Sequence, residues 1–142
     1  MHDRHQLRLT MLEAWRKAQA GEPLDGLERD ISQVISQHPE YHSLFEQGDA
    51  VCDLDFETTT NPFLHMSLHI GLREQIRCDR PASMRQRWLH ASKHLADTHD
   101  LEHRVMELMA NLLWEAQQKQ QTIDDADYLE ALNALLPLPL ND

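Results

Sequence analysis

The chain has 142 residues, with 13 Lys and Arg against 24 Asp and Glu, so its formal charge is −11 at pH 7. This acidic balance argues against binding to a nucleic-acid backbone or an anionic membrane, since both need clustered basic residues. The sequence lacks an apolar run of the roughly 20 residues that span a bilayer, and residues 1–15 lack the apolar segment and cleavage site of a secretory signal. We therefore expect a cytoplasmic protein that binds neither nucleic acid nor membrane.

Composition favours helices over strands. There are only four Gly, β-branched residues are few, and Leu, Ala, Gln and Glu, which are good helix formers, are abundant. The length suits one compact core. The sequence therefore predicts an all-α protein, with residues 1–142 forming a single-domain bundle of five to seven helices. Cys52 and Cys78 lack a Cys-x-x-Cys spacing and are expected to be reduced structural thiols.

The first half of the chain shows three helical stretches and one loop. Apolar residues recur at helical spacing over residues 4–20 and 24–37, which form the N-terminal helices of the segment 1–36. A short helix is expected to begin at Pro39, because proline is well tolerated in a first helical turn, and to end at Gly48. The acidic segment 49–60 shows no periodicity and is predicted to be an extended loop.

The second half begins at a strong helix start, because Asn61 can serve as the N-cap and Pro62 as the first helical residue. Further helices are predicted at the ranges 62–77, 81–95, 99–119 and about 122–135. The helix over 99–119 is apolar around most of its circumference, so we expect it to be largely buried. Pro137 and Pro139 prevent the last helix from continuing and leave residues 137–142 as a C-terminal tail.

Ten histidines are the main functional signal. Four pairs have the spacing i, i+4, which places both imidazoles on one helix face, as a shared metal ion requires. The pairs are His38/His42, His65/His69, His90/His94 and His99/His103. The helix face on which a pair lies indicates whether the pair is buried or solvated. His90 and His94 lie opposite the apolar stripe of their helix and are expected to be solvated.

His65 and His69 share their face with Leu68, Leu72 and Ile76. Two imidazoles on one apolar stripe must find polar partners, and a shared metal ion would satisfy both. The alternative is that each ring bonds a backbone carbonyl or a carboxylate of a neighbouring helix.

The helix over 99–119 carries His103 and Glu107 on one face, with His99 one turn earlier. If this face opposed the helix over 62–77, His65, His69, His103 and Glu107 would supply three nitrogens and one carboxylate. Such a donor set suits a divalent ion of Zn, Fe or Mn.

Reserve ligands are His99 and His42, the latter as part of a second His-x-x-x-Glu pattern with Glu46. His38 precedes Pro39 and is expected to lie outside the short helix, so it is not among the predicted ligands.

Three sequence blocks resemble a known family. Residues 38–42 read His-Pro-Glu-Tyr-His, residues 61–69 contain Asn-Pro-Phe-Leu-His, and residues 99–103 read His-Asp-Leu-Glu-His. Together with the residues around them, they resemble a family of small bacterial proteins described as a domain of unknown function. The resemblance covers about residues 37–130. It implies a helical domain with these blocks as its signature, and it implies no activity.

Two functions are compatible with these sequence patterns. The first is a metal-binding helical bundle, structural or reactive, with its site between the helices over 62–77 and 99–119. The second is a non-enzymatic interaction module with a buried histidine hydrogen-bond network and no metal, whose partner would be another protein or a second copy of the chain. Whether the protein is an enzyme stays open, because the sequence contains no nucleophile or phosphate-binding motif.

Overall fold

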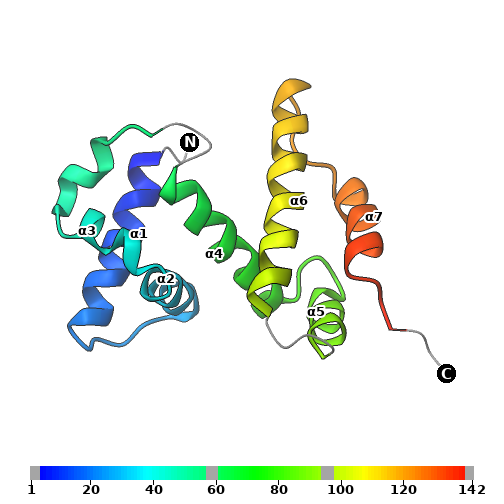
Figure 1. Cartoon of the computed structure of the whole chain (residues 1–142), viewed down its shortest axis with the longest axis horizontal. Coiled ribbons are helices and arrows are strands. Elements are labelled where there is room, and N and C mark those ends of the chain that lie inside the picture. Colours follow the sequence, from blue (N-terminus) through cyan, green and yellow to red (C-terminus); the bar gives the residue numbers. More distant parts are fainter. Residues whose placement is uncertain (1–3, 57–60, 94–97, 140–142) are drawn as a thin grey trace. The chain divides into compact units, whose positions relative to one another are not determined.

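The computed structural model describes residues 4–56, 61–93 and 98–139, and every regular element within these ranges is a helix (Figure 1). The α-helices are α1 (Arg4–Gln19), α2 (Gly26–Ser36), α3 (His42–Phe45), α4 (Pro62–Cys78), α5 (Met84–Ser92), α6 (Thr98–Gln118) and α7 (Asp125–Leu135). Two short 3-10 helices are η1 (Pro39–Tyr41) and η2 (Gly48–Asp53). The predicted all-α class is confirmed. Among the described helices, no segment combines the length and apolarity that crossing a bilayer requires.

The chain folds into two compact units, Met1–Ile70 and Gly71–Asp142. Helix α4 contributes its first part to unit 1 and its last part to unit 2. Each unit has a hydrophobic core of its own. A single domain over residues 1–142 therefore stays a prediction.

Unit 1 is built by packing α1 and α2 around the first turns of α4. Asp25 caps α2 by accepting a hydrogen bond from the Glu28 backbone, and the Glu28 side chain accepts one from the Asp25 backbone in return. This capping box fixes where α2 begins. The buried core consists of Met11, Leu12, Ala14, Ile31, Val34, Ile35, Phe45, Val51, Cys52, Phe63, Met66 and Ile70.

A buried arginine organises the segment that follows α3. Arg8 is 1% exposed, and its Nη1 donates to the backbone carbonyls of Val51, Cys52 and Leu54. These bonds hold η2 against α1. The prediction of an extended loop over 49–60 is therefore wrong for η2, because a side chain distant in the sequence satisfies its carbonyls. Residues 57–60 of that predicted loop lie outside the described residues.

Other element boundaries differ from the prediction in small ways. The short helix predicted from Pro39 is divided into η1 and α3. Helix α5 begins at Met84 rather than near Pro81. The backbone at Asp79 and Ser83 has positive φ values of 54° and 74°, so the chain turns there before the helix can start.

Unit 2 packs α5, α6, α7 and the end of α4 around a second core. Its buried residues are Leu72, Met84, Leu101, Val105, Leu132 and Leu136. The buried Arg87 donates from Nη1 to the Leu136 carbonyl, which ties the end of α7 to α5.

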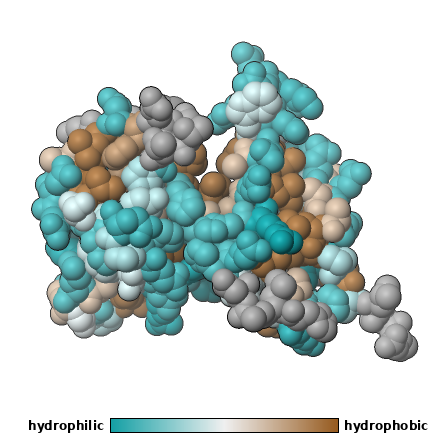
Figure 2. All heavy atoms as spheres, in the orientation of Figure 1, coloured by the Kyte–Doolittle hydropathy of each residue, from teal (hydrophilic) through white to brown (hydrophobic). Residues whose placement is uncertain are grey.

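Helix α6 is buried only in its first half. Leu101 and Val105 pack into the core of unit 2, whereas Leu113 is 38% and Trp114 is 63% exposed. The prediction that this helix is largely buried is therefore wrong for its second half, which extends past the core. The visible face of each unit in Figure 2 is mostly hydrophilic, in keeping with the acidic composition. Cys52 and Cys78 are not joined in a disulfide; Cys52 is buried and Cys78 is exposed.

Candidate metal centre

Helix α4 supplies two histidines to unit 1. The Asn61 side chain accepts hydrogen bonds from the backbone N–H groups of Phe63 and Leu64, so the predicted cap forms and α4 begins at Pro62. Residues four apart lie on one helix face, and this places His65 directly beside His69. His69 is 0% exposed, and His65 is half-buried. Their Nε2 atoms are 3.2 Å apart.

A third histidine comes from the end of α2. His38 is 5% exposed, and its Nδ1 lies 2.7 Å from the carbonyl oxygen of Val34. A carbonyl only accepts hydrogen bonds, so Nδ1 must carry the hydrogen. In the neutral ring, Nε2 then carries the lone pair that a metal would need. The hydrogen bond also fixes the orientation of the ring.

These three residues, His38, His65 and His69, form what we call the His cluster. Their rings meet at centroid distances of 4.8 to 5.2 Å, and no two rings are parallel. One candidate ligand nitrogen from each lies within 4.8 Å of the others. Two nitrogens bound to one tetrahedral Zn²⁺ would be about 3.3 Å apart, and their rings about 5 Å apart. The His65–His69 distance of 3.2 Å already matches, and His38 needs an adjustment of up to about 1.5 Å.

The aromatic side chain of Tyr41 lies against the His cluster. The Tyr41 ring is stacked on His38 at an interplanar angle of 4°, with centroids 5.5 Å apart, and it meets His65 edge-on at 6.5 Å. Burial raises the pKa of the Tyr41 phenol, and the negative charge of Glu40 adds to this shift. The phenol is therefore neutral around pH 7, and Tyr41 presents a polar but uncharged side chain to the His cluster.

His42, a predicted reserve ligand, contacts α1 and α2 instead of the His cluster. Its Nε2 donates a hydrogen bond of 2.7 Å to the carbonyl oxygen of Ile35, at the end of α2. Its ring also contacts Trp15 at a centroid distance of 5.0 Å. His42 is not a member of the His cluster.

The other predicted ligands belong to unit 2. His99 and His103 on α6 have their ring centroids 4.2 Å apart. His99 and Glu107 are exposed, whereas His103 is half-buried. The four-ligand set that would join His103 and Glu107 to His65 and His69 spans both units, and it stays a prediction.

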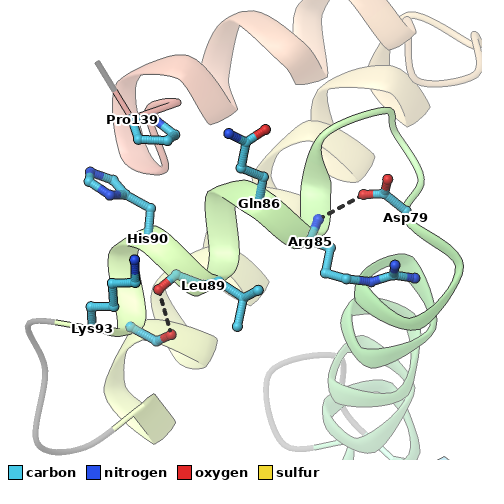
Figure 3. Close-up of a pocket in the computed structure, with 8 residues that line it drawn as sticks. Asp79, Arg85, Gln86, Leu89, His90, Lys93 and Pro139 are labelled. Atoms are coloured by element: carbon cyan, nitrogen blue, oxygen red, sulfur yellow. Dashed lines mark hydrogen bonds between the residues drawn. The ribbon is translucent and has the colours of Figure 1, made fainter. Parts of the chain in front are cut away.

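A surface pocket in unit 2 is less suited to metal binding than the His cluster. The cavity of about 580 Å³ lies along α5 and is lined by Asp79, Arg85, Gln86, Leu89, His90, Ser92, Lys93 and Pro139 (Figure 3). The Asp79 carboxylate accepts a hydrogen bond from the backbone N–H of Arg85, and the Arg85 guanidinium donates to carbonyls at the end of α4. These groups hold the turn before α5 together. We therefore place the candidate site at the His cluster, where three possible ligands lie together.

Sequence reasoning missed His38 because it considered only ligand pairs on a single helix face. His38 lies outside a helix, and only tertiary packing brings it to α4. The signal that could have found it is its position. A histidine just past the end of a helix can bond a terminal carbonyl and present its other nitrogen elsewhere.

The fold and the site define an all-α protein with a buried group of three imidazoles. The sequence model of a family described as Domain of unknown function (DUF1841) matches residues 3–134, so the chain belongs to this family. The comparison with curated proteins gave no match, and neither did the comparison with solved structures. The resemblance noted in the sequence is confirmed at the level of the family, and the function has to be argued from the site.

Proposed function

We propose that this protein binds a divalent metal ion, Zn²⁺ in the first place, at the His cluster of unit 1. The observation that carries the proposal is the convergence of His38 with His65 and His69 within 4.8 Å. His38 follows α2, whereas His65 and His69 lie on α4. The geometry of a single helix therefore does not produce the His cluster.

The chemistry of the donors favours zinc. Neutral imidazole is a ligand for Zn, Cu, Fe and Ni, whereas Mn and Mg prefer carboxylate and water oxygens. The His cluster offers three nitrogens, and among the described residues no carboxylate joins them. Of the three ions expected from the sequence, Zn²⁺ therefore fits best, and Fe²⁺ comes second.

The hydrogen bond to His38 supports the same proposal. Histidines that bind metals generally donate their second N–H to a carbonyl or carboxylate, which fixes the tautomer and the ring orientation. The bond from His38 Nδ1 to Val34 is of this kind. Burial of His38 and His69 also shields the site from competing water.

Elemental mass spectrometry of anaerobically purified protein tests the proposal. Wild-type protein should contain near-stoichiometric Zn or Fe. Changing His38→Ala or His65→Ala should lower the affinity at least about 100-fold, since losing a direct ligand costs more than losing an outer hydrogen-bond partner. His5→Ala is the matched control, because His5 is exposed on α1. Wild-type protein that takes up no Zn²⁺, or full retention of metal in both ligand variants, would refute the proposal.

The same measurement separates the His cluster from the ligand set predicted by sequence. A His103→Ala variant should keep its metal if the His cluster binds it alone. Loss of metal in His103→Ala, with retention in His38→Ala, would instead favour the set of His65, His69, His103 and Glu107. Circular dichroism on each variant shows whether the helices remain folded.

A second candidate function is a metal-free interaction module. The 3.2 Å contact between His65 and His69 favours it, since one imidazole can simply donate to the other. Thermal melts with and without a chelator distinguish the two. If free metal is about 100 times its dissociation constant, binding stabilises the fold by about 2.7 kcal/mol, and the chelator should lower Tm by roughly 5–10 °C. An unchanged Tm in protein without metal favours the interaction module.

A further inference from the structure

We infer that the pocket along α5 binds a small organic carboxylate, with the charged end of the ligand at Lys93 and its apolar part over Leu89. This binding site is separate from the proposed metal centre, because none of the residues that line the pocket belongs to the His cluster. The inference therefore does not depend on metal binding.

The pocket has the size of a small-molecule site and an apolar middle between two charged ends. Its volume is about 580 Å³, and pockets of roughly 300–1,000 Å³ are typical of small-molecule sites. Arg85, Leu89 and Lys93 are spaced four residues apart, so they follow one another along one face of α5 (Figure 3). With a rise of 1.5 Å per residue, the backbones at Arg85 and Lys93 are about 12 Å apart, and Leu89 lies midway.

Leu89 gives the pocket apolar surface that the fold leaves uncovered. Its side chain is 56% exposed, and Pro139 is a second apolar residue of the lining. A single exposed leucine is ordinary on a protein surface. Here, however, the leucine lines a hollow, so the apolar part of a ligand placed there loses contact with water on binding, which favours the complex.

The charges at the Arg85 end of the pocket are already compensated. The Asp79 carboxylate accepts a hydrogen bond of 2.9 Å from the Arg85 backbone N–H, which places a negative charge at this end. The Arg85 guanidinium donates to the carbonyls of Ile76 and Arg77 in the last turn of α4, where the helix dipole is negative. This end therefore has little attraction left for an anion.

Lys93 carries the charge that a ligand would neutralise. Its side chain is exposed, and no ion pair within the described part of the chain includes it. The net positive charge of the pocket is therefore concentrated at Lys93. One ammonium matches one carboxylate, whereas a phosphate group would bring close to two negative charges and three acceptor oxygens.

The charge of the surrounding segment also favours an anion. Residues 73–93 contain six Lys and Arg against two Asp and Glu, although the whole chain has a formal charge of −11. A small anion that approaches α5 therefore meets a locally positive surface, and the field of such a surface raises the local concentration of the anion.

Proton–nitrogen correlation NMR of the full chain tests the inference, with sodium hexanoate titrated in at constant ionic strength. Hexanoate combines one carboxylate with a short apolar chain. We expect saturable changes of chemical shift that are confined to α5 and the residues around the pocket. Acetate lacks the apolar chain and hexanol lacks the charge, so each should bind at least about five-fold more weakly than hexanoate.

Two variants test the assigned contacts. Lys93→Gln should weaken hexanoate binding about five-fold or more, because it removes the charged partner, and Leu89→Ser should weaken it because it removes the apolar surface. Lys119→Gln is the matched control: it removes the same charge from another exposed lysine of unit 2, and it should bind hexanoate like the wild type. Both pocket residues are exposed, and circular dichroism verifies that each variant is folded.

The inference is refuted if hexanoate causes no saturable change, or if the changes are scattered over both units. Equal binding of hexanol and hexanoate would refute the role of the charge, and so would wild-type affinity in Lys93→Gln. An equal loss of affinity in Lys119→Gln would show a general effect of net charge and would also refute a site at Lys93.

Discussion

Replacing Arg8 tests how unit 1 holds the His cluster in place. The Arg8 guanidinium donates to three backbone carbonyls in and just after η2 and lies over two aromatic rings, 4.5 Å from the centroid of Phe63 and 5.5 Å from that of Phe56. Phe63 lies two residues before His65 on α4. Arg8 therefore connects α1, η2 and the start of the helix that carries two of the proposed ligands.

The expected cost of Arg8→Ala is large. A hydrogen bond from a charged donor contributes about 1.5–3 kcal/mol, and buried acceptors left unpaired cost a further 1–3 kcal/mol or so. The contact with the aromatic rings adds about 1 kcal/mol. The three carbonyls share one nitrogen, so these contributions are not additive, and we expect a loss of about 3–5 kcal/mol. That is a large part of the roughly 5–15 kcal/mol that stabilises a typical domain.

Urea unfolding followed by circular dichroism measures this loss. Arg16→Ala is the matched control on the same helix: Arg16 pairs with Glu13 at 3.0 Å, but its side chain is 61% exposed, so its removal should cost less than about 1 kcal/mol. Arg8→Met keeps an apolar side chain of similar length, so its cost measures the hydrogen bonds and the cation–π contacts together, largely without a cavity. If Arg8→Ala is no more destabilising than Arg16→Ala, the role assigned to Arg8 is wrong.

Three further predictions concern other parts of the fold. Asp25→Ala should destabilise the protein by about 1 kcal/mol in the same urea assay, because it removes the cap of α2; no change would mean that the capping box contributes nothing. Glu102→Ala should cost about 2 kcal/mol or more, because Arg73, 3.1 Å away, would lose its carboxylate in a largely buried position. A double-mutant cycle with Arg73→Ala should show coupling, and additive effects would contradict the pairing. Burial raises the pKa of Tyr128 to about 12 from 10.0, so the folded protein holds the phenol proton more tightly than the unfolded chain. The stability from this group is therefore present below about pH 10 and lost as the pH rises towards 12. The difference in phenolate absorbance between wild type and Tyr128→Phe should show this high midpoint, and a midpoint near 10 would refute it.

The sequence by itself determined the helices and where most of them begin and end. Local rules suffice for this, because a cap such as Asn61 or Asp25 acts on backbone groups two or three residues away. The same locality explains why His65 and His69 could be paired correctly. Their spacing on one helix face is a property of the helix and needs no knowledge of the neighbouring elements.

Only the tertiary structure brought His38 to that pair. Its place depends on how the end of α2 packs against α4, and on a hydrogen bond to Val34 that exists once α2 has formed. The 3-10 helix η2 has the same origin, since its carbonyls are satisfied by Arg8 from α1. Contacts between distant segments follow from packing a whole core, and hydrophobic periodicity reports only which face of each helix is apolar. The sequence therefore indicated that imidazoles would meet inside the fold, and the packing of unit 1 decided which three.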